Sequence, residues 1–167
     1  KLISYSNISN IREVIMYDLN KIKDCLTTEC IGQTIIQFDE LKSTFAKSKN
    51  IFDTCPNGAI VLSEDQHDCK IRFNRKWISK RDKNIYFSII LKPYDESYSV
   101  SKFESIACAC IFEGVKYICN TNCQIKWPND IFINGKKIAS IACDEIKIKN
   151  KNEGIIINFN INVNDFF

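Results

Sequence analysis

Residues 126–139 read KWPNDIFINGKKIA. The pair Asn134-Gly135 favours a tight hairpin turn, because both residue types tolerate positive φ. It separates the apolar triplet 131–133 from a run predicted as a strand over 137–143, so the stretch predicts an antiparallel hairpin. Its first five residues add an aromatic ring, an amide, a carboxylate and an ammonium group. Such groups suit a site for an anionic ligand next to an aromatic or purine-like one, although a tight structural turn also explains them.

Further strands are predicted on both sides of this hairpin, as short apolar runs bounded by turn residues. They cover residues 34–38, 59–63, 85–91, 123–127 and 154–163. Helices are predicted where apolar residues recur at helical spacing, over residues 8–26, from Ser43 onward and over residues 101–115, the last as a buried helix. The sum predicts an α+β domain, a mixed and mostly antiparallel sheet with helices packed on one face.

The composition limits the class of protein. The 167 residues suffice for one compact domain, and 45% hydrophobic with 26% charged residues is a globular balance. The formal net charge of +3 is too weak to predict a nucleic-acid partner. No apolar run reaches the length of a membrane span, so no membrane partner is expected. The nine cysteines lack CxxC spacing and accompany one histidine, which favours reduced thiols in an intracellular protein over a zinc site.

A polar, basic stretch without periodicity extends from Asp65 to Lys83, between two predicted core strands. We expect a long loop there, and long loops inside compact domains are commonly functional or disordered. Guanidinium groups offer paired donors to phosphate, and an indole can stack on a base. The side chains concerned are Lys70, Arg72, Arg75, Lys76, Lys80, Arg81 and Trp77. From the chemistry of these side chains alone, a nucleotide or phosphate site and a solvated surface loop are equally good interpretations of the stretch.

Two further groups have both a structural and a functional interpretation. Ser43 and Thr44 precede a predicted helix, where such residues commonly cap the N-terminus. Alternatively, their hydroxyl groups face a polar ligand. Asp130 and Asp144 are candidate metal ligands, whereas an aspartate after a turn more commonly shapes or caps that turn.

Seven short motifs follow one another in a fixed order: Ser43-Thr44, the strand from Gly58 to Gln66, the basic run 70–77, 84–88, 126–130, 136–139 and 161–163. Together they resemble the catalytic domain of the biotin protein ligase family, over residues 34 to 164. The resemblance implies a catalytic domain of the class II synthetase-like fold over 34–167, which leaves residues 1–33, with their predicted helix, as an N-terminal helical extension. The family's small C-terminal β-barrel is expected to be absent.

The resemblance implies an ATP-dependent reaction in two steps. The carboxylate of biotin attacks the α-phosphorus of ATP, giving biotinyl-5′-AMP and pyrophosphate, and a lysine of a carboxylase biotin carrier domain then takes the biotinyl group. The implied ligands are biotin, ATP and Mg²⁺, and the implied partner is the carrier domain, with a homodimer left open. The implied compartment is the cytoplasm, with an organelle matrix such as a plastid as the alternative.

The resemblance also implies roles for individual residues. The implied catalytic residues are the cations Lys137, Arg72 and Lys126. The implied biotin-binding residues are Ser43, Thr44, Gln66, Lys70, Arg72, Lys137 and Ser140. The implied ATP- and adenylate-binding residues are Lys70, Arg72, Arg75, Trp77, Asn129, Asp130 and Asn162, with Asp130 also as the Mg²⁺ ligand.

Several positions at which the family has glycine carry other residues here, namely Cys69, Ile71, Asn74, Ser140, Asn158 and Asn160. Glycine permits positive φ or a close approach of backbone and ligand. Asparagine is the best substitute at positive φ, so we expect the asparagines to keep the backbone and add bulk. Two alternatives therefore stay open, a degenerate non-catalytic binding module and a lipoate–protein ligase, the latter disfavoured by the run 126–130.

Overall fold

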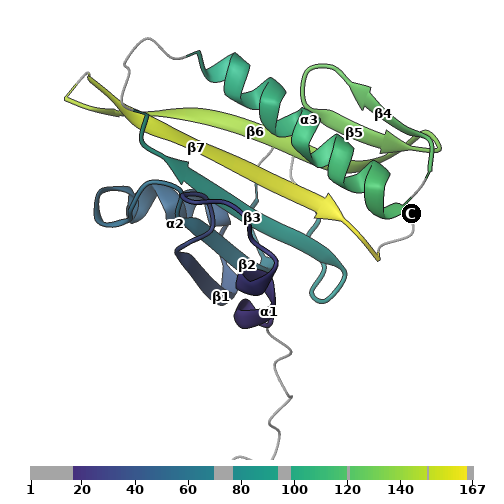
Figure 1. Cartoon of the computed structure of the whole chain (residues 1–167), viewed down its shortest axis with the longest axis horizontal. Helices are drawn as coiled ribbons and strands as arrows, with labels where there is room; N and C mark the ends of the chain where they lie inside the picture. The colour runs from purple at the N-terminus through teal and green to yellow at the C-terminus, as the bar shows by residue number, and fades with distance from the viewer. Residues whose placement is uncertain (1–16, 70–76, 94–98, 120, 150, 165–167) are drawn as a thin grey trace, which may run out of the picture.

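The computed structural model describes residues 17–69, 77–93, 99–119, 121–149 and 151–164. A seven-stranded sheet in the order β1-β2-β3-β7-β6-β5-β4 forms its centre (Figure 1). The strands are β1 (Ile35–Leu41), β2 (Ile60–Gln66), β3 (Asn84–Leu91), β4 (Cys123–Lys126), β5 (Asp130–Ile133), β6 (Lys136–Ile148) and β7 (Lys151–Asn162). β1 and β2 pair in parallel, and the other neighbours pair antiparallel. The predicted α+β class with a mixed, mostly antiparallel sheet is confirmed.

The helices are α1 (Leu19–Asp24), α2 (Thr44–Asn50), the 3₁₀ turn η1 (Phe52–Thr54) and α3 (Val100–Cys119). α1 begins after Asp18, whose carboxylate accepts hydrogen bonds from the first-turn amides. Of the helix predicted over 8–26, residues 8–16 lie outside the described residues, and α1 ends at Asp24. No helix in the described part of the chain is both long and apolar enough to span a membrane.

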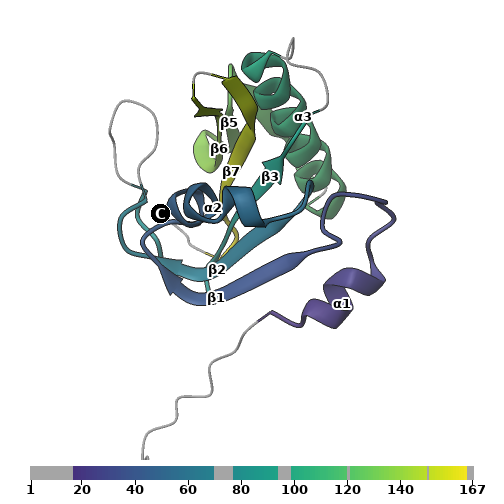
Figure 2. The same cartoon turned by 90° about the vertical axis from the view of Figure 1, so that its left-hand side faces the viewer.

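α2 and α3 lie on opposite faces of the sheet, as the turned view in Figure 2 shows. Successive side chains of a strand point to opposite faces. In β7, Phe159 therefore joins the core cluster that contains Cys108 of α3, whereas Ile156 joins the cluster that contains Phe52 of η1. The expectation of helices on one face is corrected, because β7 is buried from Gly154 to 160 and needs cover on both sides.

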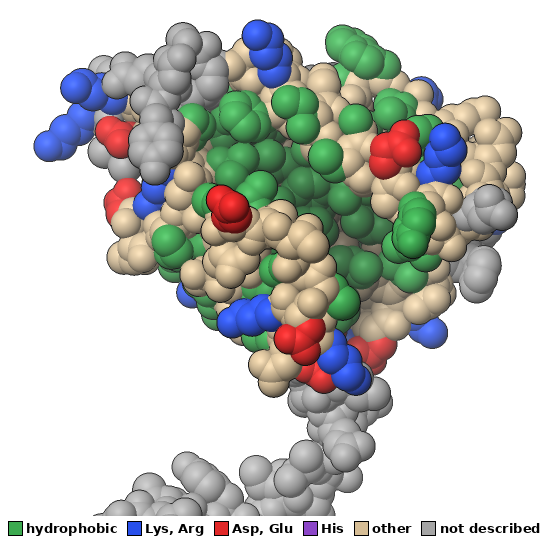
Figure 3. Space-filling model, viewed as in Figure 1, with side chains coloured by type: hydrophobic (Ala, Val, Ile, Leu, Met, Phe, Trp, Pro, Cys, Tyr) green, Lys and Arg blue, Asp and Glu red, His purple; other side chains and the backbone are tan. Residues whose placement is uncertain are grey.

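α3 packs on the sheet along only part of its surface. Ala107 and Cys108 are its buried residues, while Tyr117 and Ile118 are 90% and 80% exposed. The prediction of a buried helix is therefore wrong for its outer face. Figure 3 shows hydrophobic side chains gathered in the hollow beside α3.

The predicted hairpin is confirmed. Asn134 and Gly135 connect β5 to β6 with φ of 50° and 76°. Both values lie in the left-handed region that a two-residue hairpin turn requires. The turn thereby fixes β6 next to β5, and β7 pairs along the other side of β6.

Candidate functional site

A row of polar side chains crosses the sheet on the face that carries α2. Asn158 and Asn160 lie two residues apart on β7, so both point to this face. Asn158 pairs in register with Ser88 of β3, and Asn160 pairs with Ser140 of β6. Ser140 in turn pairs with Asp130 of β5. The sheet register thus brings polar groups together from four strands.

Five side chains of this region form one hydrogen-bonded cluster, which we call the amide network: Thr44, Gln66, Ser88, Asn158 and Asn160. The backbone N–H of Thr44 donates to Gln66 Oε1 at 2.8 Å, and Gln66 Nε2 donates to Asn160 Oδ1 at 3.0 Å. The hydroxyl groups of Thr44 and Ser88 lie 3.0 and 2.9 Å from Asn158 Oδ1. All five residues are at most 3% exposed. Buried polar groups need such partners, so the network is internally compensated.

The start of α2 separates the roles of its two hydroxyl residues. Ser43 caps the helix, and its hydroxyl oxygen accepts from the backbone N–H of Ala46 at 3.1 Å. Thr44 turns into the amide network instead. The predicted capping role therefore applies to Ser43, whereas Thr44 is the residue that faces the polar row.

The two asparagines of the network have ordinary strand backbones. Among the described residues other than glycine, positive φ occurs at Asp82, Asn134 and Lys149. The expectation that Asn158 and Asn160 preserve a positive-φ backbone is therefore corrected. What differs from glycine at these positions is the presence of a buried side chain.

A β-bulge turns Lys137 toward the polar row. Ile131 pairs with Ala139, but Phe132 pairs with Lys137, so Ile138 is an extra residue in β6. A bulge of this kind redirects the side chains beyond it. It places Lys137 on the face of Phe132, which is also the face of Asp130.

Lys137 forms an ion pair with Asp130, the carboxylate of the polar row. Its Nζ lies 2.6 Å from Asp130 Oδ1 and 5.8 Å from the centroid of the Trp77 ring. The hydroxyl of Ser140 donates to the same carboxylate oxygen at 3.2 Å. Lys126 is the register partner of Asp130 on the outer strand β4. Two ammonium-bearing residues thus flank one carboxylate, which leaves the site locally positive.

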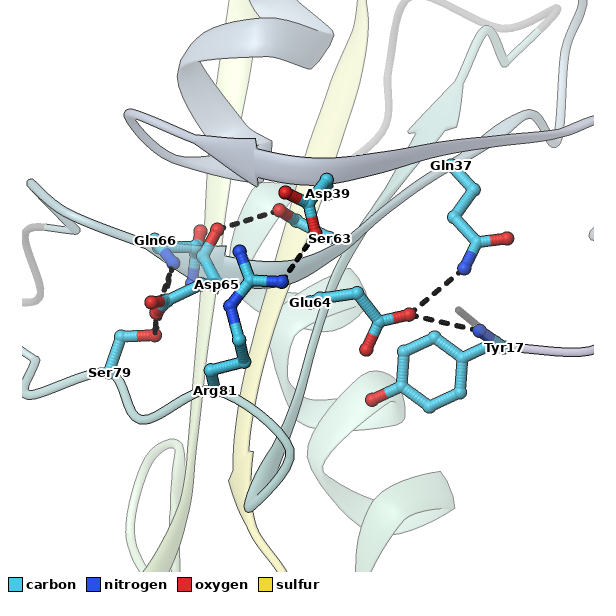
Figure 4. Close-up of polar contacts among 9 residues, drawn as sticks. All are labelled: Tyr17, Gln37, Asp39, Ser63, Glu64, Asp65, Gln66, Ser79 and Arg81. Atoms are coloured by element: carbon cyan, nitrogen blue, oxygen red, sulfur yellow. Dashed lines mark hydrogen bonds and ion pairs between the residues drawn. The ribbon is translucent and has the colours of Figure 1, made fainter. Parts of the chain in front are cut away.

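Hydrogen bonds at both ends of the basic run tie it to the network. The backbone N–H of Trp77 donates to the carbonyl of Cys69 at 2.9 Å. Ser79 donates to Asp65 at 2.5 Å, and the N–H of Gln66 donates to Ser79 at 3.1 Å (Figure 4). The predicted Lys70, Arg72 and Arg75 lie outside the described residues.

Two polar atoms predicted to lie near a nucleotide have no hydrogen-bond partner among the described residues. They are Nε1 of Trp77 and Oδ1 of Asn162, and both are buried. Asn162 and Lys137 line a cavity of about 590 Å³ whose other walls are largely aliphatic, including Ile111 of α3 and Ile161. This cavity lies on the α3 face of the sheet, opposite the amide network. An apolar cavity with few polar groups is the usual form of a small-molecule site.

Other predicted residues serve the fold. The Asn129 carboxamide donates to the carbonyl of Ile141 at 2.6 Å and to Glu104 at 3.1 Å, which ties the turn before β5 to β6 and α3. Lys126 Nζ lies 5.5 Å from the centroid of the Phe132 ring. These contacts give Asn129 a structural role in addition to any role at a ligand.

Two buried polar residues, one inside the amide network and one outside it, were not predicted as site residues. Ser88 is a small hydroxyl residue inside the hydrophobic run 85–91, and that interruption was the available signal. Glu64 is buried and accepts from the backbone N–H of Tyr17 and from Gln37 Nε2, both at 2.9 Å (Figure 4). Burial raises the pKa of Glu64 above its ordinary value, against the opposing effect of these two donors.

The donor set for a metal is small. The described residues contain no group of three or more His, Cys, Asp or Glu side chains able to hold a metal ion. Asp130 is the carboxylate of the row, and Lys137 already pairs with it. Mg²⁺ commonly binds one or two protein carboxylates together with substrate phosphates. The site therefore fits an ion that arrives with a nucleotide.

Residues 35–162 match the model of the biotin/lipoate A/B protein ligase family. The bifunctional ligase/repressor BirA of Bacillus subtilis is 30% identical over 146 residues, which cover 87% of this chain and 45% of that protein. Biotin–protein ligase 2 of Arabidopsis thaliana is 26% identical over 133 residues, 76% of this chain and 40% of that protein. The chain therefore spans less than half the length of these curated relatives.

The fold also resembles solved structures. Biotin protein ligase from Aquifex aeolicus in complex with biotin and ATP aligns with a TM-score of 0.70 at 24% identity, covering 81% of this chain and 54% of that chain. The enzyme from Leishmania major in complex with biotinyl-5-AMP aligns with a TM-score of 0.60 at 22% identity, covering 78% and 57%. At these identities the likeness shows the fold.

Proposed function

Because the chain belongs to the biotin/lipoate A/B protein ligase family, we propose that it is an ATP-dependent biotin–protein ligase. In the first step the carboxylate of biotin attacks the α-phosphorus of ATP, forming biotinyl-5′-AMP and releasing pyrophosphate. In the second step a lysine amine of a carboxylase biotin carrier domain attacks the acyl carbon, and AMP leaves. The biotin- and ATP-bound structural neighbour supports this choice of ligands.

The position of Lys137 is the observation that carries the proposal. The first step brings a carboxylate to a phosphate, and both are anions, so a fixed cation must offset the repulsion. The bulge and the Asp130 ion pair hold the Lys137 ammonium beside the polar row, 5.8 Å from the Trp77 ring centroid. Reacting anions that reach Lys137 compete with Asp130 for its charge.

The flanking groups support the same geometry. Trp77 and Asn162 each present a buried polar atom without a partner in the described structure, which suits the edge of an adenine ring. Thr44 and Gln66 lie on the same face of the sheet and are proposed to meet the polar head of the acid. Arg72, Arg75 and Lys70 are proposed to close over the phosphates, and bound Mg²⁺ would offset charge on them near Asp130.

The deciding experiment measures pyrophosphate release with biotin, ATP and Mg²⁺. We expect biotin-dependent release from the unaltered protein. Lys137→Ala should lower its rate by at least about a hundredfold, because one donor to a developing charge is commonly worth that much. Lys147→Ala is the matched control, since Lys147 lies on the same strand with an exposed side chain that pairs with Glu145, and its rate should be unchanged.

Two other candidates share one observation in their favour. The amide network already satisfies Thr44 and Gln66 internally, which suits a lipoate–protein ligase or a non-catalytic binding module. Release that depends on lipoate and not on biotin would select the lipoate ligase. No release with either acid, together with no calorimetric binding of biotin, would select the binding module.

A further inference from the structure

The amide network uses its hydrogen-bonding groups within the protein. Gln66 donates from Nε2 to Asn160 and accepts at Oε1 from the backbone of Thr44. The hydroxyl of Thr44 lies within hydrogen-bond distance of Asn158, and so does that of Ser88. The groups proposed to meet the acid substrate are therefore bonded to two asparagines.

A carboxamide has the same groups as half of a cyclic urea, a carbonyl oxygen and an N–H donor. The Oδ1 atoms of Asn158 and Asn160 accept from hydroxyl and amide donors, as the carbonyl oxygen of a urea would. The two residues are 3% and 1% exposed, and β3 and β6 pair with both flanks of β7 at these positions. The strand backbone therefore holds both carboxamides in the network.

We infer that Asn158 and Asn160 are specificity-determining residues, which take the place of a ureido group and so weaken the binding of biotin. This inference rests on the proposed function. A urea reaches Thr44 and Gln66 only after the carboxamides give up their partners. The exchange replaces one set of hydrogen bonds by another, so it gains little, and it leaves two displaced amides to be accommodated.

Calorimetric titration of biotin tests the inference. The double variant Asn158→Gly/Asn160→Gly should bind biotin at least about tenfold more tightly than the unaltered protein, since it removes both competing carboxamides. Asn152→Gly is the matched control on β7, at the hairpin end of the strand. Its affinity for biotin should equal that of the unaltered protein. Octanoate, an acid without a urea, should gain no affinity from the double change.

A second pair of substitutions guards against loss of folding. Asn158→Ala/Asn160→Ala removes the same polar groups and keeps a side chain in the strand, where glycine is unfavourable. Circular dichroism and a cooperative thermal transition establish that each variant is folded before titration. The folded pair that best retains its transition temperature then provides the binding comparison.

The outcomes separate this inference from the proposed function. The inference is overturned if the unaltered protein binds biotin as tightly as the folded variant pair or more tightly. It is also overturned if neither protein binds biotin, or if octanoate gains as much affinity as biotin. Pyrophosphate release is read independently. Tighter biotin binding by the variants without release from any form supports the inference and contradicts the ligase activity. Pyrophosphate release from an unaltered protein that already binds biotin as tightly as the variants supports the ligase activity and contradicts the inference.

Discussion

The orientation of Lys137 depends on its neighbour Ile138, the extra residue of the β-bulge. Its motif identified Lys137 as a candidate from the sequence, because lysine after the hairpin turn belongs to the resemblance. The bulge could not be predicted, since it depends on how β5 and β6 align. Asp130 was likewise predicted as a metal ligand, and the structure places it in an ion pair with Lys137.

Glu64 supplies a prediction at the scale of one residue. Its pKa is raised above its ordinary value in the folded protein, chiefly by burial. Below the pKa of Glu64 in the unfolded chain, the carboxyl group is protonated in both states, and its ionisation costs the folded protein no stability. As pH rises through the folded pKa, ionisation costs the folded state more than the unfolded state, and stability is lost. Glu64→Gln should therefore raise the transition temperature at pH 7 and have less effect at pH 4.

Thermal unfolding followed by circular dichroism at both pH values measures this difference. Glutamine retains an oxygen that can accept from Tyr17 and Gln37. Glu113→Gln, on the exposed surface of α3, controls for the loss of one negative charge. A Glu64→Gln variant whose gain in transition temperature is larger at pH 4 than at pH 7 would contradict the assignment.

Helices and strands with a clear periodicity of apolar residues were predicted well, but their first and last residues were predicted less well. α3 was predicted over 101–115 and extends over Val100–Cys119. β6 was predicted over 137–143 and extends to Ile148, because pairing with β7 continues past the apolar run. Strand ends of this kind depend on a distant partner rather than on the local sequence.

Two glycines supply a prediction at the scale of elements. A Cβ added at Gly114 of α3 meets no heavy atom within 4 Å, whereas one at Gly154 of β7 would lie 2.3 Å from the carbonyl oxygen of Leu91. Gly114→Ala should raise the free energy of unfolding by about 0.5–1 kcal/mol, because alanine favours the helix. Gly154→Ala should lower it by about 1–3 kcal/mol through overpacking.

Chemical denaturation of the two variants and the unaltered protein measures both changes. The pair is matched, since each variant adds one methyl group. Equal effects of the same sign would show that the packing between β3 and β7 is looser than described. A destabilising Gly114→Ala would instead indicate that this face of α3 is covered.

For the whole molecule, the sequence predicted the class and the local hairpin but not the order of the strands. β3 and β7 pair along eight residues, although about seventy positions separate them. No local pattern specifies such a pairing. The amide network follows from it, because Ser88 and Asn158 meet only when β3 and β7 are neighbours.

The cysteines report on the packing of the whole molecule. Cys25, Cys30, Cys110 and Cys119 are exposed, whereas Cys55, Cys69 and Cys108 are buried. Burial raises the pKa of Cys69 to about 11 and that of Cys143 to about 12, so little reactive thiolate forms at these sites near neutral pH. Iodoacetamide at pH 8 should modify the exposed set first, as peptide mass spectrometry would show. Modification of Cys69 as fast as Cys110 would contradict the buried network.

The central place of β7 has a consequence for protein synthesis. β1 to β3 and β4 to β6 are made first, yet they are neighbours in the sheet only through β7. While the ribosome is still translating the residues before Lys151, each group presents an unpaired strand edge, at β3 and at β6. Such edges are prone to pair with other chains. The nascent protein is therefore most exposed to aggregation until its seventh strand has emerged.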